Sequence, residues 1–179
     1  AYGLVSYWTA YLKANYPEEY MAALLTSSST ADKRALYLAE CRHMGIPVGR
    51  PNVNRSYAGF TADSEGVRFG LSSIRNVGKN AVDGIVKARQ ERGHFTSFQD
   101  FLDKIPVEVC NKRTMQSLIK AGAFDSFDHP RRALLARSDD AVDAVIDLKR
   151  NEEHGQVDLF ASLGAEDAGA SSFTMDIPD

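Results

Sequence analysis

The chain has 179 residues, of which 44% are hydrophobic and 25% are charged, and its formal net charge at pH 7 is -3. This composition is typical of a globular protein with one domain or two small ones. No run of about 18 apolar residues occurs, which excludes a membrane-spanning helix. Cys41 and Cys110 have neither a CxxC spacing nor a histidine at ligand spacing, which argues against a disulfide framework or a zinc site and predicts that both fill the core.

The first third of the chain is predicted to be helical. Apolar side chains recur at helical spacing over residues 2–15, and Pro17 begins a second helix, because proline suits the first turn. Thr30 is a suitable N-cap for a third helix, which ends at Gly45. Three aromatic side chains near the start are expected to lie in the core rather than to stack on nucleotides. They are Tyr2, Tyr7 and Trp8.

A connector and a hairpin are predicted next. Residues 46–54 contain two prolines and are expected to be extended, because the residue before proline avoids the helical region. The segment Asp63-Ser64-Glu65-Gly66 is a good turn between the flanking segments 57–62 and 67–70. We therefore expect a small β-hairpin.

The C-terminal half is again predicted to be helical. Ser97 and Asn111 are N-cap residues for two short helices, and Pro130 begins a long helix that runs to about Glu153. The final residues, 162–179, are small, acidic and weakly apolar, so we expect a tail that is disordered when free.

Residues 70–89, GLSSIRNVGKNAVDGIVKAR, carry two short apolar faces separated by a break. Leu71 and Ile74 form the first face, and residues 81–86 form the second at helical spacing. We expect two helices that pack against each other here, joined by a tight connector.

The connector Asn76-Val77-Gly78 suits such a hairpin. Asn and Gly tolerate the left-handed backbone, Val77 can pack between the helices, and Gly78 lets a partner approach the main chain closely. The helix that follows presents unpaired N–H groups, with Lys79 beside them. This arrangement is a phosphate site by its geometry.

Charge is distributed unevenly along the chain. Between Val67 and His94 there are six basic residues and two acidic ones, whereas eleven acidic and two basic residues follow Ser138. A basic centre followed by an acidic tail favours a polyanionic partner for the centre. A second basic group is expected to be mainly solvated, although together its members can extend a phosphate track. These residues are Lys112, Arg113, Lys120, Arg131 and Arg132.

The hairpin resembles the helix-hairpin-helix motif of DNA-binding proteins, in which hairpin amides and a nearby basic residue hold the DNA backbone without reading bases. The usual turn is Gly-hydrophobic-Gly. Asn76 replaces the first Gly, so a residue with a side chain must adopt the hairpin conformation; an ordinary helical turn with solvated lysines is the alternative. The expected DNA-binding residues are Arg75, Asn76, Val77, Gly78, Lys79 and Asn80.

Four segments, 1–27, 40–56, 67–89 and 111–125, occur in the order and approximate spacing of the alpha subunit of bacterial DNA polymerase III, a C-family replicative polymerase. The chain resembles the end of the fingers and the helix-hairpin-helix region of that family. The resemblance implies a cytoplasmic protein whose partners are duplex DNA and the rest of the alpha chain, with no membrane partner.

The same resemblance implies that catalysis lies elsewhere. The catalytic aspartates of the family belong to the palm, which would precede Ala1, and the parent polymerase would need Mg²⁺ there. We expect this piece of a longer protein to be inactive alone, with no catalytic residue, metal or cofactor of its own. Asp139, Asp143 and Asp147 share a helical face, but we expect that face to be solvated surface.

Residues 155–160, GQVDLF, resemble the peptide by which such polymerases bind the ring-shaped sliding clamp. Gln156 and Asp158 match the polar positions, and Leu159 and Phe160 match the apolar positions that fill a pocket on the clamp. The alternative is that the Leu-Phe pair packs against the preceding helix.

We therefore expect a mainly α fold: a helical bundle with a small β-hairpin, a helix-hairpin-helix DNA-binding region and a disordered acidic C-terminal tail. The expected domains are a fingers-like region 1–54, the DNA-binding region 55–128, a long helix with the clamp peptide 129–161 and a flexible tail 162–179. The alternatives are a scaffold of a repair or recombination protein, an error-prone polymerase paralogue, and a module whose basic face binds acidic proteins.

Overall fold

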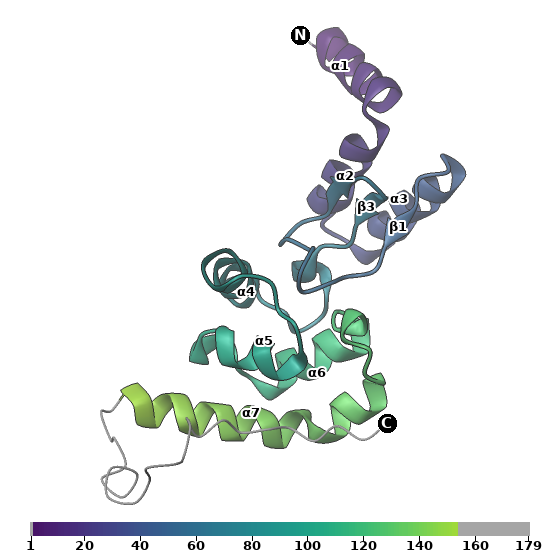
Figure 1. Cartoon of the computed structure of the whole chain (residues 1–179). Helices are drawn as coiled ribbons and strands as arrows, with labels where there is room; N and C mark the ends of the chain where they lie inside the picture. Colours follow the sequence, from purple (N-terminus) through teal and green to yellow (C-terminus); the bar gives the residue numbers. More distant parts are fainter. Residues whose placement is uncertain (1, 154–179) are drawn as a thin grey trace, which may run out of the picture.

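In the computed structural model, residues 2–153 are described, and the predicted clamp peptide and tail lie outside this range. The described part is mainly helical, with seven α-helices and a small three-stranded sheet, which confirms the predicted fold class (Figure 1). The α-helices are α1 Tyr2–Asn15, α2 Pro17–Ser27, α3 Ala31–His43, α4 Lys79–Arg92, α5 Phe98–Lys104, α6 Lys112–Ala121 and α7 Arg131–Glu153. The strands are β1 Val48–Gly49, β2 Thr61–Asp63 and β3 Gly66–Arg68, and the 3-10 turns are η1 Leu71–Ser73, η2 Val107–Val109 and η3 Asp125–Phe127.

The predicted helix ends are confirmed by the hydrogen bonds at the caps. Thr30 accepts a bond from the Lys33 amide at 3.3 Å. Ser97 and Asn111 do the same for the amides three residues ahead, at 3.1 and 2.8 Å. Gly122 ends α6 in the left-handed conformation, with φ 82°, because glycine has no side chain to clash there.

The sheet has the order β1-β3-β2. The predicted hairpin is confirmed: β2 and β3 pair in antiparallel fashion, with Ala62 opposite Val67. The predicted connector supplies β1, which pairs in parallel with β3 and places Val48 beside Val67. Nothing local in the sequence signals a two-residue parallel pairing, because such pairing depends on segments that fold back from a distance.

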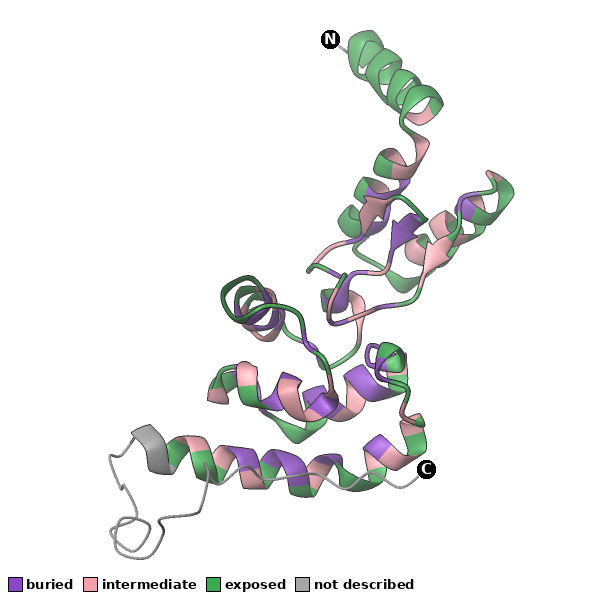
Figure 2. Ribbon diagram, in the orientation of Figure 1, coloured by how far each residue is buried: buried purple, intermediate pink, exposed green. Residues whose placement is uncertain are grey.

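Two clusters of buried side chains organise the molecule. The first joins α2, α3 and the sheet and includes Met21, Leu25 and Cys41. The second joins α4 to α7, and Phe124 lies within it, with its ring centroid 5.0 Å from that of Phe98 and 4.9 Å from that of Phe101. In Figure 2 the buried residues recur along α5, α6 and α7, as expected where one face of each helix packs on the core.

The expectation that the first aromatic residues lie in the core is wrong. No residue of α1 is buried; the exposed fraction is 91% for Tyr2 and 55% for Trp8. In Figure 1 this helix projects from the rest of the protein. Helical spacing identifies an apolar face, but it does not show whether another element covers that face.

Candidate nucleic-acid interface

The hairpin consists of the turn η1, a connector and the helix α4. The first helix is shorter than expected, because only Leu71–Ser73 form a single 3-10 turn. The Ile74 amide donates to the Leu71 carbonyl at 3.1 Å, and the Val77 amide donates to the Ile74 carbonyl at 3.2 Å. These two bonds close the connector into a tight turn that leads directly into α4.

Asn76 occupies the position where the motif usually has its first glycine. Its φ is 65°, in the left-handed region, which asparagine adopts more readily than most residues with a side chain. Its side chain amide donates to Ser117 Oγ at 3.2 Å, and its carbonyl accepts from Thr114 Oγ1 at 3.1 Å. The predicted hairpin conformation is therefore present, and contacts with α6 hold it.

Val77 anchors the connector from beneath. Its side chain is buried in the second core with Leu71 and with Val82 and Ile85 of α4. This packing confirms the expectation that Val77 packs inside the hairpin, and its expected contact with DNA stays a prediction. The residues on both sides of it, Asn76 and Gly78, are exposed. The core therefore holds the middle of the connector and leaves its two ends accessible.

The start of α4 presents four unpaired donors. The N–H groups of Gly78, Lys79, Asn80 and Ala81 have no acceptor within the described range. A Cβ at Gly78 would meet nothing within 4 Å, and the Lys79 ammonium has no hydrogen bond or ion pair with any described residue. Unpaired N–H groups at a helix start favour an anion, and the nearby ammonium strengthens that preference.

The number of basic residues between Val67 and His94 overstates the positive charge at the surface, because two of the six are buried. Arg89 Nη1 donates to the carbonyls of Val53 and Ser56, both at 3.1 Å. The Arg89 guanidinium also lies over the Tyr57 ring, 4.8 Å from its centroid. Arg89 therefore stabilises the fold and is not part of the candidate interface.

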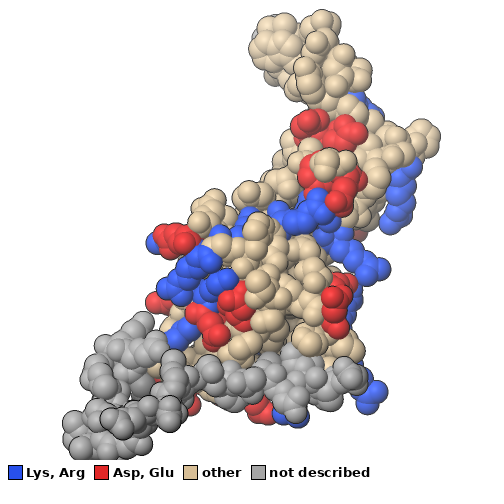
Figure 3. Space-filling model, viewed as in Figure 1, with Lys and Arg blue, Asp and Glu red and all other residues tan. Residues whose placement is uncertain are grey.

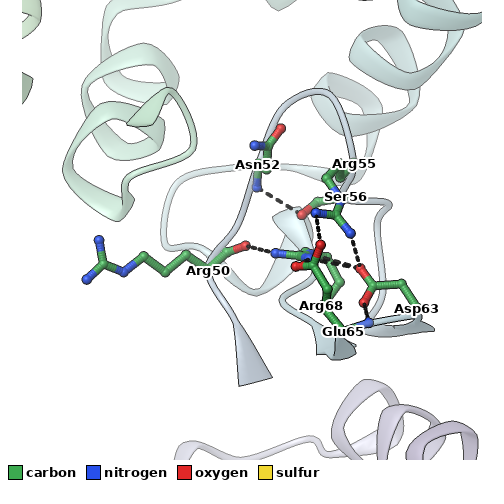
Figure 4. A network of polar contacts seen from close by, with 7 residues as sticks. All are labelled: Arg50, Asn52, Arg55, Ser56, Asp63, Glu65 and Arg68. Carbon is green, nitrogen blue, oxygen red and sulfur yellow. Dashed lines mark hydrogen bonds and ion pairs between the residues drawn. The ribbon is translucent and has the colours of Figure 1, made fainter. Parts of the chain in front are cut away.

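Arg68 is the second buried cation, 7% exposed, and belongs to a network with Arg55, Asp63 and Glu65 (Figure 4). Arg68 Nη2 donates to Glu65 at 2.8 Å, and Arg55 Nη1 donates to the same carboxylate at 2.7 Å. The hydrogen bond from Arg55, together with that from Arg68, lowers the pKa of Glu65. This network holds the turn of the β-hairpin against the connector 50–56.

The remaining cations of the centre are at the surface. Figure 3 shows Lys and Arg side chains over the middle of the molecule, whereas the surface of α1 carries little charge. Arg75 and Lys79 lie on the exposed hairpin, and Lys87 lies on α4, 3.8 Å from Glu91. Arg75 and Lys79 are the two cations that remain at the hairpin itself.

The second basic group is partly neutralised within the protein. Lys112 Nζ lies 2.6 Å from Asp143 Oδ2, a hydrogen bond that raises the pKa of Lys112. Arg131 Nε donates to Asp125 Oδ1 at 2.7 Å. The acidic face of α7 is therefore not simply solvated: Asp143 binds Lys112, and Asp139 accepts a bond from the side chain of Gln116 at 2.9 Å, which ties α7 to α6.

The described residues offer neither a metal site nor a membrane-spanning helix. From 2 to 153, no group of three or more His, Cys, Asp or Glu side chains is arranged to hold a metal ion. None of the helices in the same range combines the length and apolarity that a membrane crossing requires. The expected clamp-binding residues Gln156, Asp158, Leu159 and Phe160 lie outside the described residues.

The fold and the hairpin define a helix-hairpin-helix protein. Residues 45–134, half of the chain, match the family model for the helix-hairpin-helix motif, and the chain belongs to this family. The matched residues include the whole hairpin and α6, to which the hairpin is bonded.

The relatives it matches are alpha subunits of DNA polymerase III. The chain is 59% identical to that of Saccharopolyspora erythraea over 169 residues, which cover 94% of the chain and 14% of the relative. It is 50% identical to that of Mycobacterium tuberculosis over 183 residues, which cover 99% of the chain and 15% of the relative. It is 44% identical to that of Thermus aquaticus over 164 residues, which cover 91% of the chain and 13% of the relative. The predicted resemblance is confirmed, and the chain spans about one seventh of the length of these relatives.

Proposed function

We propose that the chain is the part of a replicative DNA polymerase alpha subunit that holds duplex DNA by its phosphates, without sequence preference, during DNA replication in the cytoplasm. One observation carries this proposal: the four unpaired N–H groups of Gly78–Ala81 lie beside Lys79 in a hairpin that is fixed by the core and by α6. The family match and the relatives support it.

The geometry favours contact with phosphate over contact with bases. Main-chain N–H groups at a helix start bind a phosphate oxygen equally well whichever base the nucleotide carries. The open space at Gly78 allows the backbone of a DNA strand to approach. Arg75 and Lys79 add attraction that does not depend on sequence. The bound duplex would therefore be held in position while other parts of the alpha subunit act on it.

The polymerase reaction itself is proposed to belong to the rest of the alpha subunit. That reaction needs metal ions held by carboxylates, which activate the attacking hydroxyl and stabilise the leaving phosphate. The chain covers 14% to 15% of the relatives with the highest identity quoted above. We propose Mg²⁺ chemistry for the complete subunit and a DNA-holding role for this region.

Docking on the sliding clamp is a further part of the proposal, and its support is the sequence of residues 155–160 alone. Leu159 and Phe160 can each contribute roughly 1.5–3 kcal/mol by filling an apolar pocket, before the cost of ordering the peptide. That sum implies weak binding by the peptide in isolation. Affinity would increase when polymerase and clamp share one DNA molecule, because each then raises the effective concentration of the other.

Fluorescence anisotropy with two duplexes of equal length and unrelated sequence tests the DNA-holding role. We expect the two dissociation constants to agree within about threefold and to increase together with salt, since each neutralised phosphate contributes about 0.9 to the slope of log K against log salt. Acidic protein partners bound equally well, or one duplex strongly preferred, would contradict the proposal.

A further inference from the structure

A cavity of about 310 Å³ lies next to the hairpin, between the two cores. It is lined by the end of α2, by α3, by the loop before β2, by η1 and by the first residue of α4. The residues that line it include Thr26, Arg34, Gly59, Ser72, Ser73 and Lys79.

The walls of this cavity are held together by hydrogen bonds. Thr26 Oγ1 accepts from the Phe60 amide at 2.9 Å, which fixes the loop to α2. The amides of Leu71 and Ser72 donate to the carbonyls of Tyr57 and Ala58 at 2.9 and 3.1 Å, which fixes η1 to the same loop. The cavity is therefore a defined feature of the junction between the cores.

Close main-chain approach also shapes the cavity. A Cβ at Gly59 would lie 2.8 Å from the Thr26 methyl, and a Cβ at Gly70 would lie 2.5 Å from the Gly59 carbonyl carbon. Two glycines thus allow the loop to lie between α2 and η1. A larger residue at either position would move a wall.

The lining is cationic. Arg34 and Lys79 have no carboxylate partner in the described range, and Arg34 binds only Ser28, through bonds to its hydroxyl and carbonyl at 3.4 and 3.3 Å. No Asp or Glu lines the cavity in the part of the chain that the structure describes. The hydroxyls of Ser72 and Ser73 have no hydrogen bond to any described residue and are available as donors.

We propose that this cavity binds a phosphoryl group of a nucleic-acid strand, adjacent to the phosphate held by the hairpin amides. The inference rests on the proposed DNA-holding function and extends it to a second contact. Lys79 joins the two sites, because it lines the cavity and also begins α4. Arg34 would supply the second cation and Ser72 and Ser73 neutral donors, a combination suited to an oxyanion.

The test compares Arg34→Gln with Lys33→Gln in the salt series. Both changes remove one positive charge from adjacent positions of α3, but Lys33 does not line the cavity. We expect Arg34→Gln to reduce the magnitude of the salt slope by about 0.9, the contribution of one phosphate, and Lys33→Gln to leave it unchanged. Arg34→Lys keeps the cation and is expected to retain the slope of the unmodified chain.

Three results would overturn this inference while the unmodified chain still binds duplex. One is the same slope for Arg34→Gln and Lys33→Gln. Another is that Arg34→Gln and Arg34→Lys weaken duplex binding equally and both lower the melting temperature. That result would show that Arg34 acts only through its bonds to Ser28. The third is Arg34-dependent binding of inorganic pyrophosphate with no change in the duplex slope, which would assign the cavity to a free polyphosphate. Absence of duplex binding by the unmodified chain would instead contradict the proposed function itself.

Discussion

Thr114 and Asn76 lie 38 residues apart in the sequence, and the Thr114 hydroxyl donates to the Asn76 carbonyl at 3.1 Å. Thr114 is buried in the first turn of α6, whereas Asn76 is exposed on the hairpin and holds a positive φ. The bond therefore connects a strained surface residue to the core. It sets the orientation of the hairpin, and so of the unpaired amides that follow it.

Asn76→Ala should destabilise the protein by about 1 kcal/mol, because alanine is disfavoured in the left-handed region and cannot bind Ser117. Asn76→Gly should be nearly neutral, since relief of the backbone strain offsets the lost side-chain bond. Urea unfolding measures both. Equal loss in the two variants would indicate that the side chain, and not the backbone conformation, determines the effect.

Gly78→Val should weaken duplex binding at least about tenfold, the expected cost of losing one amide contact to a charged group. Its φ of -77° and the open space around its Cβ position admit valine without a clash, so the melting temperature should fall only slightly, by the cost of valine at the N-cap of α4. Gly3→Ala, in similarly open space on α1, is the matched control and should bind like the unmodified chain. A normal affinity for Gly78→Val would exclude close backbone approach at this position.

Arg89→Met should reduce the free energy of unfolding by about 2 to 4 kcal/mol, because it leaves the buried Val53 and Ser56 carbonyls without their donor. Lys87→Met, on the exposed side of the same helix, should change it by less than about 0.5 kcal/mol. Urea unfolding of the two variants tests the assignment of Arg89 to the fold. A small change in the free energy of unfolding for Arg89→Met would contradict a structural role for Arg89 and make it a candidate for DNA contact.

Acid should destabilise the protein partly through Asp125. The hydrogen bond from Arg131, together with the nearby Arg50, lowers the pKa of Asp125 in the folded state. A carboxyl with a lowered folded pKa stabilises the protein above its unfolded pKa, about 3.9, and that stabilisation is lost as pH falls through the folded pKa.

Unfolding measured from pH 6 to pH 2 should therefore show a smaller loss of stability for Asp125→Asn than for the unmodified chain. Parallel curves for the two proteins would show that the Asp125–Arg131 pair makes no pH-dependent contribution.

Phe160→Ala should abolish binding to the sliding clamp and leave duplex binding unchanged, because the proposed peptide and the hairpin are separate sites. Surface plasmon resonance with immobilised clamp and anisotropy with duplex measure the two activities. Loss of both activities in this variant would contradict separate sites.

The features predicted successfully from the sequence are those that depend on neighbours in the chain. Ser97 and Asn111 are recognisable as caps because their side chains reach amides three residues away, and the turn at residues 63–66 determines the β-hairpin. The hairpin connector at 76–78 belongs to the same class, since its backbone conformation follows from residue types that tolerate it.

The features that were missed depend on tertiary structure. Arg89 has the same local signature as an exposed phosphate ligand, yet it binds carbonyls 33 and 36 residues away. The cavity brings Arg34 next to Lys79 from a different helix, and no spacing along the chain reveals that neighbourhood. The prediction for Trp8 was wrong because helical periodicity identifies an apolar face but not the element that would cover it, and Trp8 is exposed.

An amide NMR titration of the chain with a short duplex at low salt tests most directly whether the start of α4 holds the DNA backbone. We expect the largest shifts at the amides of Gly78, Lys79, Asn80 and Ala81, and we expect added salt to reverse them. If the duplex binds while these four amides stay unchanged, or if the largest shifts lie on α7, the hairpin does not hold the DNA backbone.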